Sequence, residues 1–266
     1  SFAALLSAAT PPVITAADQD DIFQANQRLG RGVNLGNFFE VQRDQSWGVK
    51  LTPDHLSLIK QAGFDSIRLP VKWSDYAAHE KPYSIEASMF QRVDSWLARA
   101  EKEGLNVVLN IHHYDGLDQD PDAHSARFTA LWTQIAAHYQ DRGSWLYFEL
   151  DNEPHDKLTD RWNEILHLGL AAVRTTNPTR PVIIGPTHWN GIRALPQLDL
   201  PADPNLIVTV HMYNPHEFTH QGASWAGDTV KAIKDRPWGS EQDQAALEKE
   251  LQQAAEDQMI VELVQG

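Results

Sequence analysis

Asn152 and Glu153 are the first residues whose types and spacing indicate chemistry. They follow an apolar, aromatic-rich run at residues 146–150, which has the length of one buried parallel strand. Pro154 comes next, and proline cannot continue a strand ladder because it has no N–H group. The amide and the carboxyl are therefore expected at the carboxyl end of a strand, where barrels of alternating strands and helices place their reactive groups. Taken alone, the tripeptide could also be a polar turn that enters the next helix.

Polar side chains stand at the ends of most other strand-like runs as well. They are Asn34, Arg68, His112, His188 and His211. Arg68 is a permanent cation, and a cation beside a carboxyl lowers the pKa of that carboxyl and keeps it ionised. A single arginine or histidine at a strand end is usually a structural hydrogen-bonding group. Four such groups on four successive strand ends indicate an active site instead.

These groups suit the hydrolysis of a bond between two neutral sugars. That reaction needs a proton for the leaving oxygen and negative charge near the developing oxocarbenium ion, and carboxyl groups supply both. We assign Glu153 as the general acid/base and Asn152 as a hydrogen-bonding partner of a sugar 2-hydroxyl. His112 and His211, together with Tyr213, would orient carboxylates and sugar hydroxyls.

The same chemistry needs no metal ion and no cofactor, and we expect neither. The chain has no cysteine, which excludes thiolate ligands and thiolate nucleophiles. His112 and His113 are adjacent, and adjacent residues of a strand point to opposite faces, so this pair is not expected to share one ion. His211 and His216 lack an obvious third partner.

Aromatic side chains near the expected strand ends could bind sugar rings, because sugars present apolar C–H surface that packs on an aromatic face. The candidates in loops are Trp73, Trp189, Trp225, Phe38 and Phe39. The tryptophans on expected helices are predicted to be core residues instead, and these are Trp96, Trp132 and Trp162. Asn34 and His113 complete the set that we expect to contact substrate.

The chain around these residues alternates strand-like and helix-like segments. Strands are expected at residues 32–36, 64–70, 105–114, 146–150, 181–185, 206–213 and 259–263. Helical segments are expected at residues 53–63, 89–104, 128–143, 156–175 and 243–256. This alternation predicts right-handed β–α–β units and a parallel sheet.

Two α/β architectures fit this alternation, a TIM (β/α)8-type barrel and a doubly wound sheet. A doubly wound sheet collects its ligand groups at one crevice and usually carries a glycine-rich phosphate loop. Gly30, Gly32 and Gly36 do not form such a loop, because no helix follows them directly. Polar residues end nearly every strand, which favours the barrel.

The composition limits the partners and the compartment. The chain has 266 residues with 22 Lys and Arg against 36 Asp and Glu, a net charge of −14, so nucleic acid is not an expected partner. No apolar run reaches the roughly 18 residues of a membrane span. We assign residues 1–20 to an N-terminal tail, the remnant of an export signal or a linker, and residues 21–266 to one barrel domain. We expect a secreted protein, because a polymer-degrading enzyme must meet its substrate outside the cell.

The sequence resembles glycoside hydrolase family 5, the retaining cellulase family of the (β/α)8 clan, at several motifs in the same order. The matching segments are 29–37 (LGRGVNLGN), 63–70 (GFDSIRLP), 110–114 (NIHHY), 148–155 (FELDNEPH), 211–215 (HMYNP) and 218–225 (FTHQGASW). The resemblance implies an active site that contains Arg68, His112, Asn152, Glu153, His211 and Tyr213. It also implies that the substrate is β-1,4-glucan and that the activity is that of an endo-1,4-β-glucanase, a cellulase.

The C-terminal part departs from the family pattern. Family members carry the nucleophile as a glutamate that ends the seventh strand, in a Gly-Glu-Phe-Gly-like sequence, and the eighth strand contributes a tryptophan. Here Glu262 is the only late carboxylate on a strand-like run, and it is the candidate nucleophile. Otherwise the C-terminal quarter is truncated, rewritten or supplied by another chain.

We therefore expect a barrel that is incomplete or atypically closed at its seventh and eighth strands. Missing strands would expose parallel edges to water. A second copy in a homodimer, or the final segment in an unusual pairing, would cover them. Two further functions stay open: a weak or inactive carbohydrate-binding remnant of such an enzyme, and the same hydrolysis on mannan, xyloglucan or mixed-linkage glucan.

Overall fold

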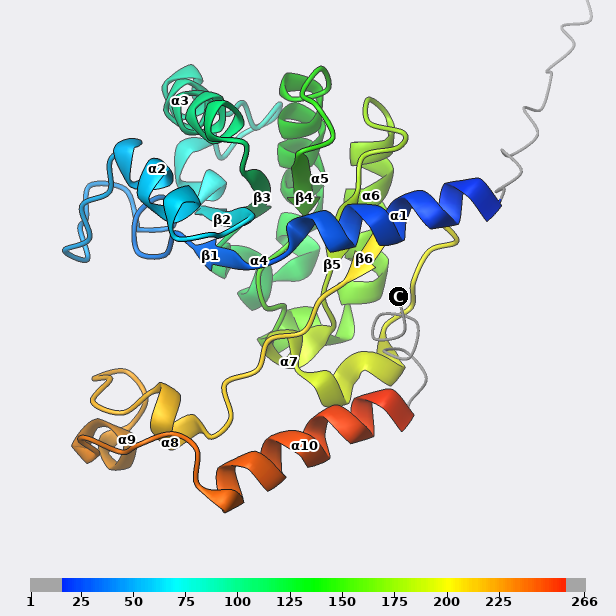
Figure 1. Ribbon diagram of the computed structural model, residues 1–266. Helices are drawn as coiled ribbons and strands as arrows, with labels where there is room; N and C mark the ends of the chain where they lie inside the picture. Colours follow the sequence, from blue (N-terminus) through cyan, green and yellow to red (C-terminus); the bar gives the residue numbers. More distant parts are fainter. Residues whose placement is uncertain (1–15, 257–266) are drawn as a thin grey trace, which may run out of the picture.

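The protein is built on an open parallel sheet of six strands, with long helices on its outer side (Figure 1). The structure is a computed structural model that describes residues 16–256. The strands are β1 Gly32–Asn34, β2 Ser66–Val71, β3 Asn106–Ile111, β4 Leu146–Glu149, β5 Val182–Ile184 and β6 Leu206–Val208. They follow one another in chain order, and every neighbouring pair is parallel. This is the arrangement of a (β/α) barrel wall.

Helices precede, connect and follow these strands. The α-helices are α1 Ala16–Leu29, α2 Asp54–Gln61, α3 Ala87–Glu103, α4 Asp115–Gln119, α5 Pro121–His138, α6 Trp162–Arg174, α7 Thr187–Asn190, α8 His216–Thr219, α9 Asp228–Ala232 and α10 Glu241–Glu256. The 3-10 helices are η1 Trp73–Tyr76, η2 Asp156–Asp160 and η3 Ile192–Gln197.

The ends of α3 and α5 show why these segments become helices. The apolar residues of α3, such as Met89 and Leu97, recur at helical spacing and are buried. Gly104 ends α3 with a left-handed φ of 68°, which glycine adopts readily because it has no Cβ. At the start of α5, the side chain of Asp120 accepts a hydrogen bond from the N–H of Ala123.

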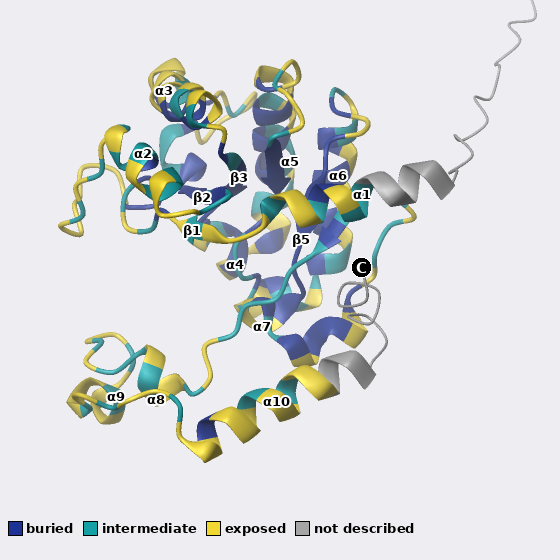
Figure 2. Cartoon of the chain, in the orientation of Figure 1, coloured by how far each residue is buried: buried dark blue, intermediate teal, exposed yellow. Residues whose placement is uncertain are grey.

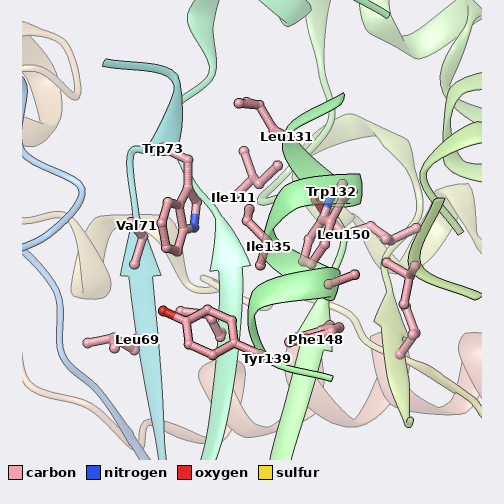
Figure 3. Close-up of a cluster of buried hydrophobic side chains, with 14 of the residues drawn as sticks. Leu69, Val71, Trp73, Ile111, Leu131, Trp132, Ile135, Tyr139, Phe148 and Leu150 are labelled. Atoms are coloured by element: carbon pink, nitrogen blue, oxygen red, sulfur yellow. Dashed lines mark hydrogen bonds between the residues drawn. The ribbon is translucent and has the colours of Figure 1, made fainter. Parts of the chain in front are cut away.

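The main core lies between the sheet and the helices that cover it (Figures 2 and 3). Trp132 of α5 packs on Phe148 of β4, with their ring centroids 5.4 Å apart. Its Nε1 donates to the carbonyl oxygen of Leu150 at 2.9 Å, so the one polar group of the indole is paired inside the core. The three tryptophans that were predicted to be core residues are all buried: Trp96, Trp132 and Trp162.

Helix α1 lies across the sheet (Figure 1). Ala25 of this helix shares a small apolar cluster with Val108, Tyr147, Ile183 and Ile207, which come from four neighbouring strands. The hydroxyl of Tyr147 also donates to the carbonyl oxygen of Ala25 at 2.7 Å. Helix α1 therefore packs on all four strands from β3 to β6, on the side of the sheet remote from the polar strand ends.

Several element boundaries differ from the predicted ones. Helix α1 begins at Ala16, before the expected domain boundary at residue 21, and residues 1–15 lie outside the described part of the chain. Strand β6 ends at Val208, and the helix predicted over residues 156–175 is split into η2 and α6. The strand predicted at residues 259–263 lies outside the described residues.

Within residues 16–256, β1 and β6 are the two edges of the sheet and do not pair with each other. The barrel wall is therefore open on this side, which is consistent with the expected incomplete barrel. Helices α8, α9 and α10 follow β6 and are mostly exposed (Figure 2). No helix in the described range has both the length and the apolarity that crossing a membrane would require.

Candidate active site

Glu153 lies just beyond the carboxyl end of β4, as the sequence predicts. The segment before Glu153 is hydrogen-bonded to both neighbouring strands, β3 and β5. The N–H of Leu150 donates to Ile183 on β5 at 3.1 Å, and the N–H of Asn152 donates to Ile111 on β3 at 3.1 Å. Glu153 then adopts a left-handed φ of 57°, an uncommon conformation for a residue with a side chain. The chain thus turns sharply at the proposed acid/base.

One carboxylate oxygen of Glu153 has two hydrogen-bond partners. Nδ1 of His211 lies 2.6 Å from Oε1, and the hydroxyl of Tyr213 donates to the same oxygen at 2.8 Å. Both partners come from the extended segment that follows β6. Because Oε1 already has two partners, Oε2 is the oxygen left to carry a proton or to contact substrate.

The surroundings of Glu153 favour its ionised form. Burial by itself raises the pKa of Glu153, but the hydrogen bonds from His211 and Tyr213, together with the charges of His211 and Arg68, outweigh burial. The pKa of Glu153 is therefore lower than usual. Burial and the Glu153 carboxylate raise the pKa of Tyr213 to about 12, so the phenol keeps its proton and remains a donor.

Arg68 of β2 joins three polar side chains, one from β1 and two from β4 and the segment that follows it. Its guanidinium forms a two-point ion pair with Glu149 of β4, at 2.7 Å from Nε to Oε2 and 2.9 Å from Nη2 to Oε1. Nη2 also donates to Oδ1 of Asn152 at 2.8 Å, and Nη1 donates to Oδ1 of Asn34 at 3.1 Å. The amide of Asn152 is thereby oriented, and its Nδ2 is the group that can donate to a sugar hydroxyl.

Glu149 is a site residue that the sequence analysis did not single out. Its side chain is 2% exposed, and a buried carboxylate is tolerated when it is paired and hydrogen-bonded. The sequence did contain a signal for it. A lone acidic residue inside an apolar strand needs a cationic partner, and Arg68 was the permanent cation expected at another strand end.

His112 and His113 lie against each other, with ring centroids 4.5 Å apart. The prediction that they point to opposite faces is wrong, because β3 ends at Ile111 and His113 has a left-handed φ of 51°. Burial, aided by the charge of Arg68, lowers the pKa of His112 well below its usual value, and burial lowers the pKa of His113 as well. Nδ2 of Asn110 lies 3.2 Å from Nδ1 of His112 and donates to it, which places the proton of the neutral ring on Nε2.

Three exposed tryptophans, one in α7 and two in loops, are available on the surface. Trp189 is 51% exposed and stacks on His155, with ring centroids 5.2 Å apart. Trp225 is 75% exposed. Trp47, which the sequence analysis did not select, is also exposed and lies edge-on to His113 with centroids 5.9 Å apart. Trp189, Trp225 and Trp47 therefore have surface available to a sugar ring.

Trp73 was predicted to contact substrate, and that prediction is wrong. Trp73 is 0% exposed, because η1 turns the indole inward against Phe90 of α3. Phe39 is buried too, and Phe38 is half-buried. Both phenylalanines pack on Trp96, with ring centroids 5.8 and 5.3 Å from it. These three side chains belong to the packing beneath the loops.

The structure brings most of the predicted polar residues together at one end of the sheet. Two hydrogen-bonded groups form there: Asn34, Arg68, Glu149 and Asn152 in one, and Glu153, His211 and Tyr213 in the other. A cavity of about 450 Å³ lies beside His211 and Tyr213 and is also lined by His188. The candidate nucleophile Glu262 lies outside the described residues. Across residues 16–256, no three or more His, Asp or Glu side chains are arranged to hold a metal ion.

The chain is similar to known cellulases over most of its length. A family model described as cellulase (glycosyl hydrolase family 5) matches residues 28–260. Endoglucanase H of Acetivibrio thermocellus is 33% identical over 235 residues, which are 88% of this chain and 25% of that protein. The crystal structure of endoglucanase Cel5A from Thermotoga maritima is 44% identical with a TM-score of 0.84, and the match covers 89% of this chain and 77% of that one. Cel5A in complex with a mannotriose substrate gives a TM-score of 0.85 at the same identity and coverage.

These similarities confirm the predicted barrel fold and the resemblance to glycoside hydrolase family 5. The chain spans about a quarter of the length of Endoglucanase H.

Proposed function

The chain belongs to glycosyl hydrolase family 5, and on that premise we propose that it is a retaining endo-β-1,4-glucanase with Glu153 as its general acid/base. The observation that carries this proposal is the pair of partners on Oε1 of Glu153, which leaves Oε2 to exchange a proton with substrate. The ion pair of Arg68 and Glu149 supports it by fixing the amide of Asn152 beside the acid.

The mechanism uses Glu153 twice. In the first step Oε2 gives its proton to the glycosidic oxygen while a second carboxylate attacks the anomeric carbon, so that the glycosidic bond breaks and a glycosyl-enzyme forms. In the second step the ionised Glu153 takes a proton from water, whose oxygen attacks the anomeric carbon and releases the second carboxylate. The lowered pKa of Glu153 suits this second step. A carboxylate nucleophile nearby would raise the pKa of Glu153, which suits the first step because Glu153 must then hold a proton.

Retaining hydrolysis requires a second carboxyl about 5–5.5 Å from the first. Glu262 remains our candidate for this role. Replacement of Glu262 by glutamine should abolish turnover and leave substrate binding intact. If turnover persists in Glu262→Gln, the nucleophile is another carboxylate.

The proposed substrate is β-1,4-glucan. Asn152 has an oriented amide for the sugar 2-hydroxyl, and Trp189 and Trp225 have exposed faces for sugar rings. Endoglucanase H and Cel5A are named endoglucanases, and Cel5A is also seen with mannotriose. A panel of soluble cellulose, mannan, xyloglucan and mixed-linkage glucan would therefore rank the substrates directly.

The deciding experiment is a reducing-sugar assay on soluble cellulose with Glu153→Gln as the matched variant. We expect turnover in the unchanged chain and a loss of at least about 100-fold in the variant, because general acid catalysis contributes about 10² to 10⁴-fold. Equal activity in the two would remove Glu153 from the mechanism. Binding of cellulose without turnover in the unchanged chain would instead support the alternative function, a carbohydrate-binding remnant.

We further propose that the protein is secreted and that a second copy covers the open side of the sheet. The support for the homodimer is that β1 and β6 each have one strand neighbour within the described residues. Light scattering should then give twice the chain mass of 30.0 kDa. A compact monomer would favour cover by the C-terminal segment instead. Recovery of the protein from culture medium of its native host would test export.

A further inference from the structure

Trp189 lies in α7, an unusual turn of the chain that follows strand β5. Three successive residues of this turn, His188, Trp189 and Asn190, have left-handed φ values of 55°, 58° and 55°. Residues with side chains rarely take this conformation, and it persists where the surrounding structure holds it, often at functional sites. Asn190 is fully buried, whereas Trp189 is 51% exposed. The turn thus joins a buried asparagine to an exposed indole.

The turn is attached to the residues around the proposed acid/base. The N–H of Trp189 donates to the carbonyl oxygen of Pro154 at 3.3 Å. At the next residue, the carbonyl oxygen of Asn190 accepts a hydrogen bond from the N–H of His211 at 2.9 Å, and His211 is itself a partner of Glu153. The backbone of Trp189 is therefore placed relative to Glu153 from two directions.

His155 is the residue that contacts the indole ring itself. Among the described residues it is the one ring that stacks on Trp189, with centroids 5.2 Å apart and ring planes 22° apart. Nδ1 of His155 lies 2.7 Å from the carbonyl oxygen of Glu153, and Oδ1 of Asp118 is farther from the same nitrogen, at 3.4 Å. A carbonyl oxygen only accepts, so Nδ1 carries a proton and donates it whether the ring is neutral or charged. The imidazole is thus fixed on the backbone of the acid/base.

We propose that His155 is a positioning residue that holds the indole of Trp189 in register with Glu153, so that the ring is already oriented when a β-glucan chain binds. This inference rests on the proposed function and adds to it a residue that sets the place of the substrate. An exposed indole without a stacking partner would sample several rotamers, and fixing one of them on binding costs free energy. An indole that is stacked beforehand avoids that cost. His155 should therefore strengthen substrate binding without contacting the reacting atoms.

Three substitutions of His155 separate its ring from its hydrogen bond. His155→Asn places an NH₂ group near the former position of Nδ1, so it can keep the bond to the carbonyl oxygen of Glu153 but has no ring to stack. His155→Phe keeps a ring and has no donor, and His155→Ala removes both. The matched control is His138→Ala, because His138 of α5 stacks on Phe90 of α3 with centroids 4.2 Å and planes 23° apart.

The first measurement follows the indole in the absence of substrate. The ¹H–¹⁵N magnetic resonance signal of the Trp189 indole is identified by its loss in Trp189→Phe, and a ring stacked on the indole shifts this signal. We expect the signal to remain shifted in His155→Phe and to move towards that of a free indole in His155→Ala and His155→Asn. An unchanged signal in His155→Ala or His155→Asn would overturn the inference, because the indole would then be held without the imidazole ring.

The second measurement is the calorimetric binding of cellohexaose, with Glu153→Gln present in every protein to prevent turnover. This background keeps the carbonyl oxygen that His155 binds. We expect the Kd to rise about 2- to 12-fold in His155→Ala and His155→Asn, the equivalent of one lost aromatic pair, and to change by less than about 2-fold in His155→Phe. His138→Ala should leave the Kd unchanged. An unchanged Kd in His155→Ala, or no binding of cellohexaose by the parent protein, would overturn the inference.

A double-mutant cycle tests whether His155 acts through Trp189. In a Trp189→Ala background, His155→Ala should cause no further loss of affinity. A further loss of the same size would overturn the inference, because His155 would then affect binding by another route.

Steady-state kinetics on soluble cellulose give the matching result for the active chain. His155→Asn should raise KM with little change in kcat, because it removes no group that transfers a proton. The spectroscopic and binding measurements need no turnover. A chain that binds cellohexaose in the expected pattern but does not hydrolyse cellulose would therefore refute the proposed hydrolysis and support the role of His155.

Discussion

Arg68 and Glu149 form a two-point ion pair at the strand ends although 81 residues separate them in the chain. The same guanidinium binds Asn152, which precedes the proposed acid/base. A buried carboxylate, a fixed cation and an oriented amide thus form one rigid unit beside Glu153. The stability and the chemistry of this site are therefore linked.

Removal of the cation from this unit should destabilise the whole domain. Arg68→Met leaves the carboxylate of Glu149 buried without a partner, and we expect a loss of about 3–5 kcal/mol in the free energy of unfolding. Chemical denaturation measures this loss. The matched control is Arg43→Met, which breaks an exposed pair with Glu86 and should cost much less, because water screens exposed ion pairs. An equal loss in the free energy of unfolding in the two variants would mean that the pair with Glu149 stabilises the domain no more than an exposed ion pair does.

Tyr213→Phe should shift the pH dependence of the proposed hydrolysis towards higher pH. Tyr213 donates to Oε1 and lowers the pKa of Glu153, and its own pKa of about 12 keeps it a donor throughout the working range. Loss of this donor raises the pKa of Glu153, so the protonated acid survives to higher pH. We expect the alkaline limb of the pH–rate profile to rise by up to about 1 unit. A shift in the opposite direction would contradict this assignment of the hydrogen bond.

Truncation of Trp189 should weaken substrate binding, whereas truncation of Trp73 should reduce stability. Trp189→Ala removes an exposed ring and should raise KM while the melting temperature stays within a few degrees. Trp73→Ala opens a cavity in the core and should cost about 3–5 kcal/mol of stability. Michaelis kinetics and thermal unfolding of both variants test the pair. An unchanged KM in Trp189→Ala would remove that ring from the substrate site.

Asp118 should make the protein less stable as the pH rises from 4 to 7. Burial raises the pKa of Asp118 to about 6, above the usual value of 3.8. Its contribution to folding is fully present below its unfolded pKa and is lost as the pH rises through 6. In Asp118→Asn this loss is absent, so the variant should gain about 1–3 kcal/mol relative to the unchanged chain between pH 4 and pH 7.

Unfolding free energies at the two pH values test this dependence on Asp118. Asp160→Asn, which changes an exposed aspartate of η2, is the control. A pH dependence in Asp118→Asn that matches the unchanged chain would mean that Asp118 titrates like a surface group.

The sequence by itself determined the architecture and the place of the proposed acid. Apolar runs of strand length alternate with helically spaced segments, and glycine or proline ends many of them, so the parallel sheet could be predicted. The same reasoning placed four site residues at the carboxyl ends of the strands: Arg68, Asn152, Glu153 and His211. The carboxyl ends of parallel strands meet at the same edge of the sheet whatever the details of the packing.

The tertiary structure alone decided how side chains beyond the strand ends are directed. His113, Glu153 and Asn190 each take a left-handed φ, which ends the simple alternation of faces on which the sequence reasoning relied. Trp73 turned inward because η1 follows its strand directly. The contacts of Glu149 with Arg68 and of Asn190 with His211 join distant parts of the chain. Local sequence cannot fix such contacts, because they depend on the backbone conformation of loops that only the packing of the whole domain selects.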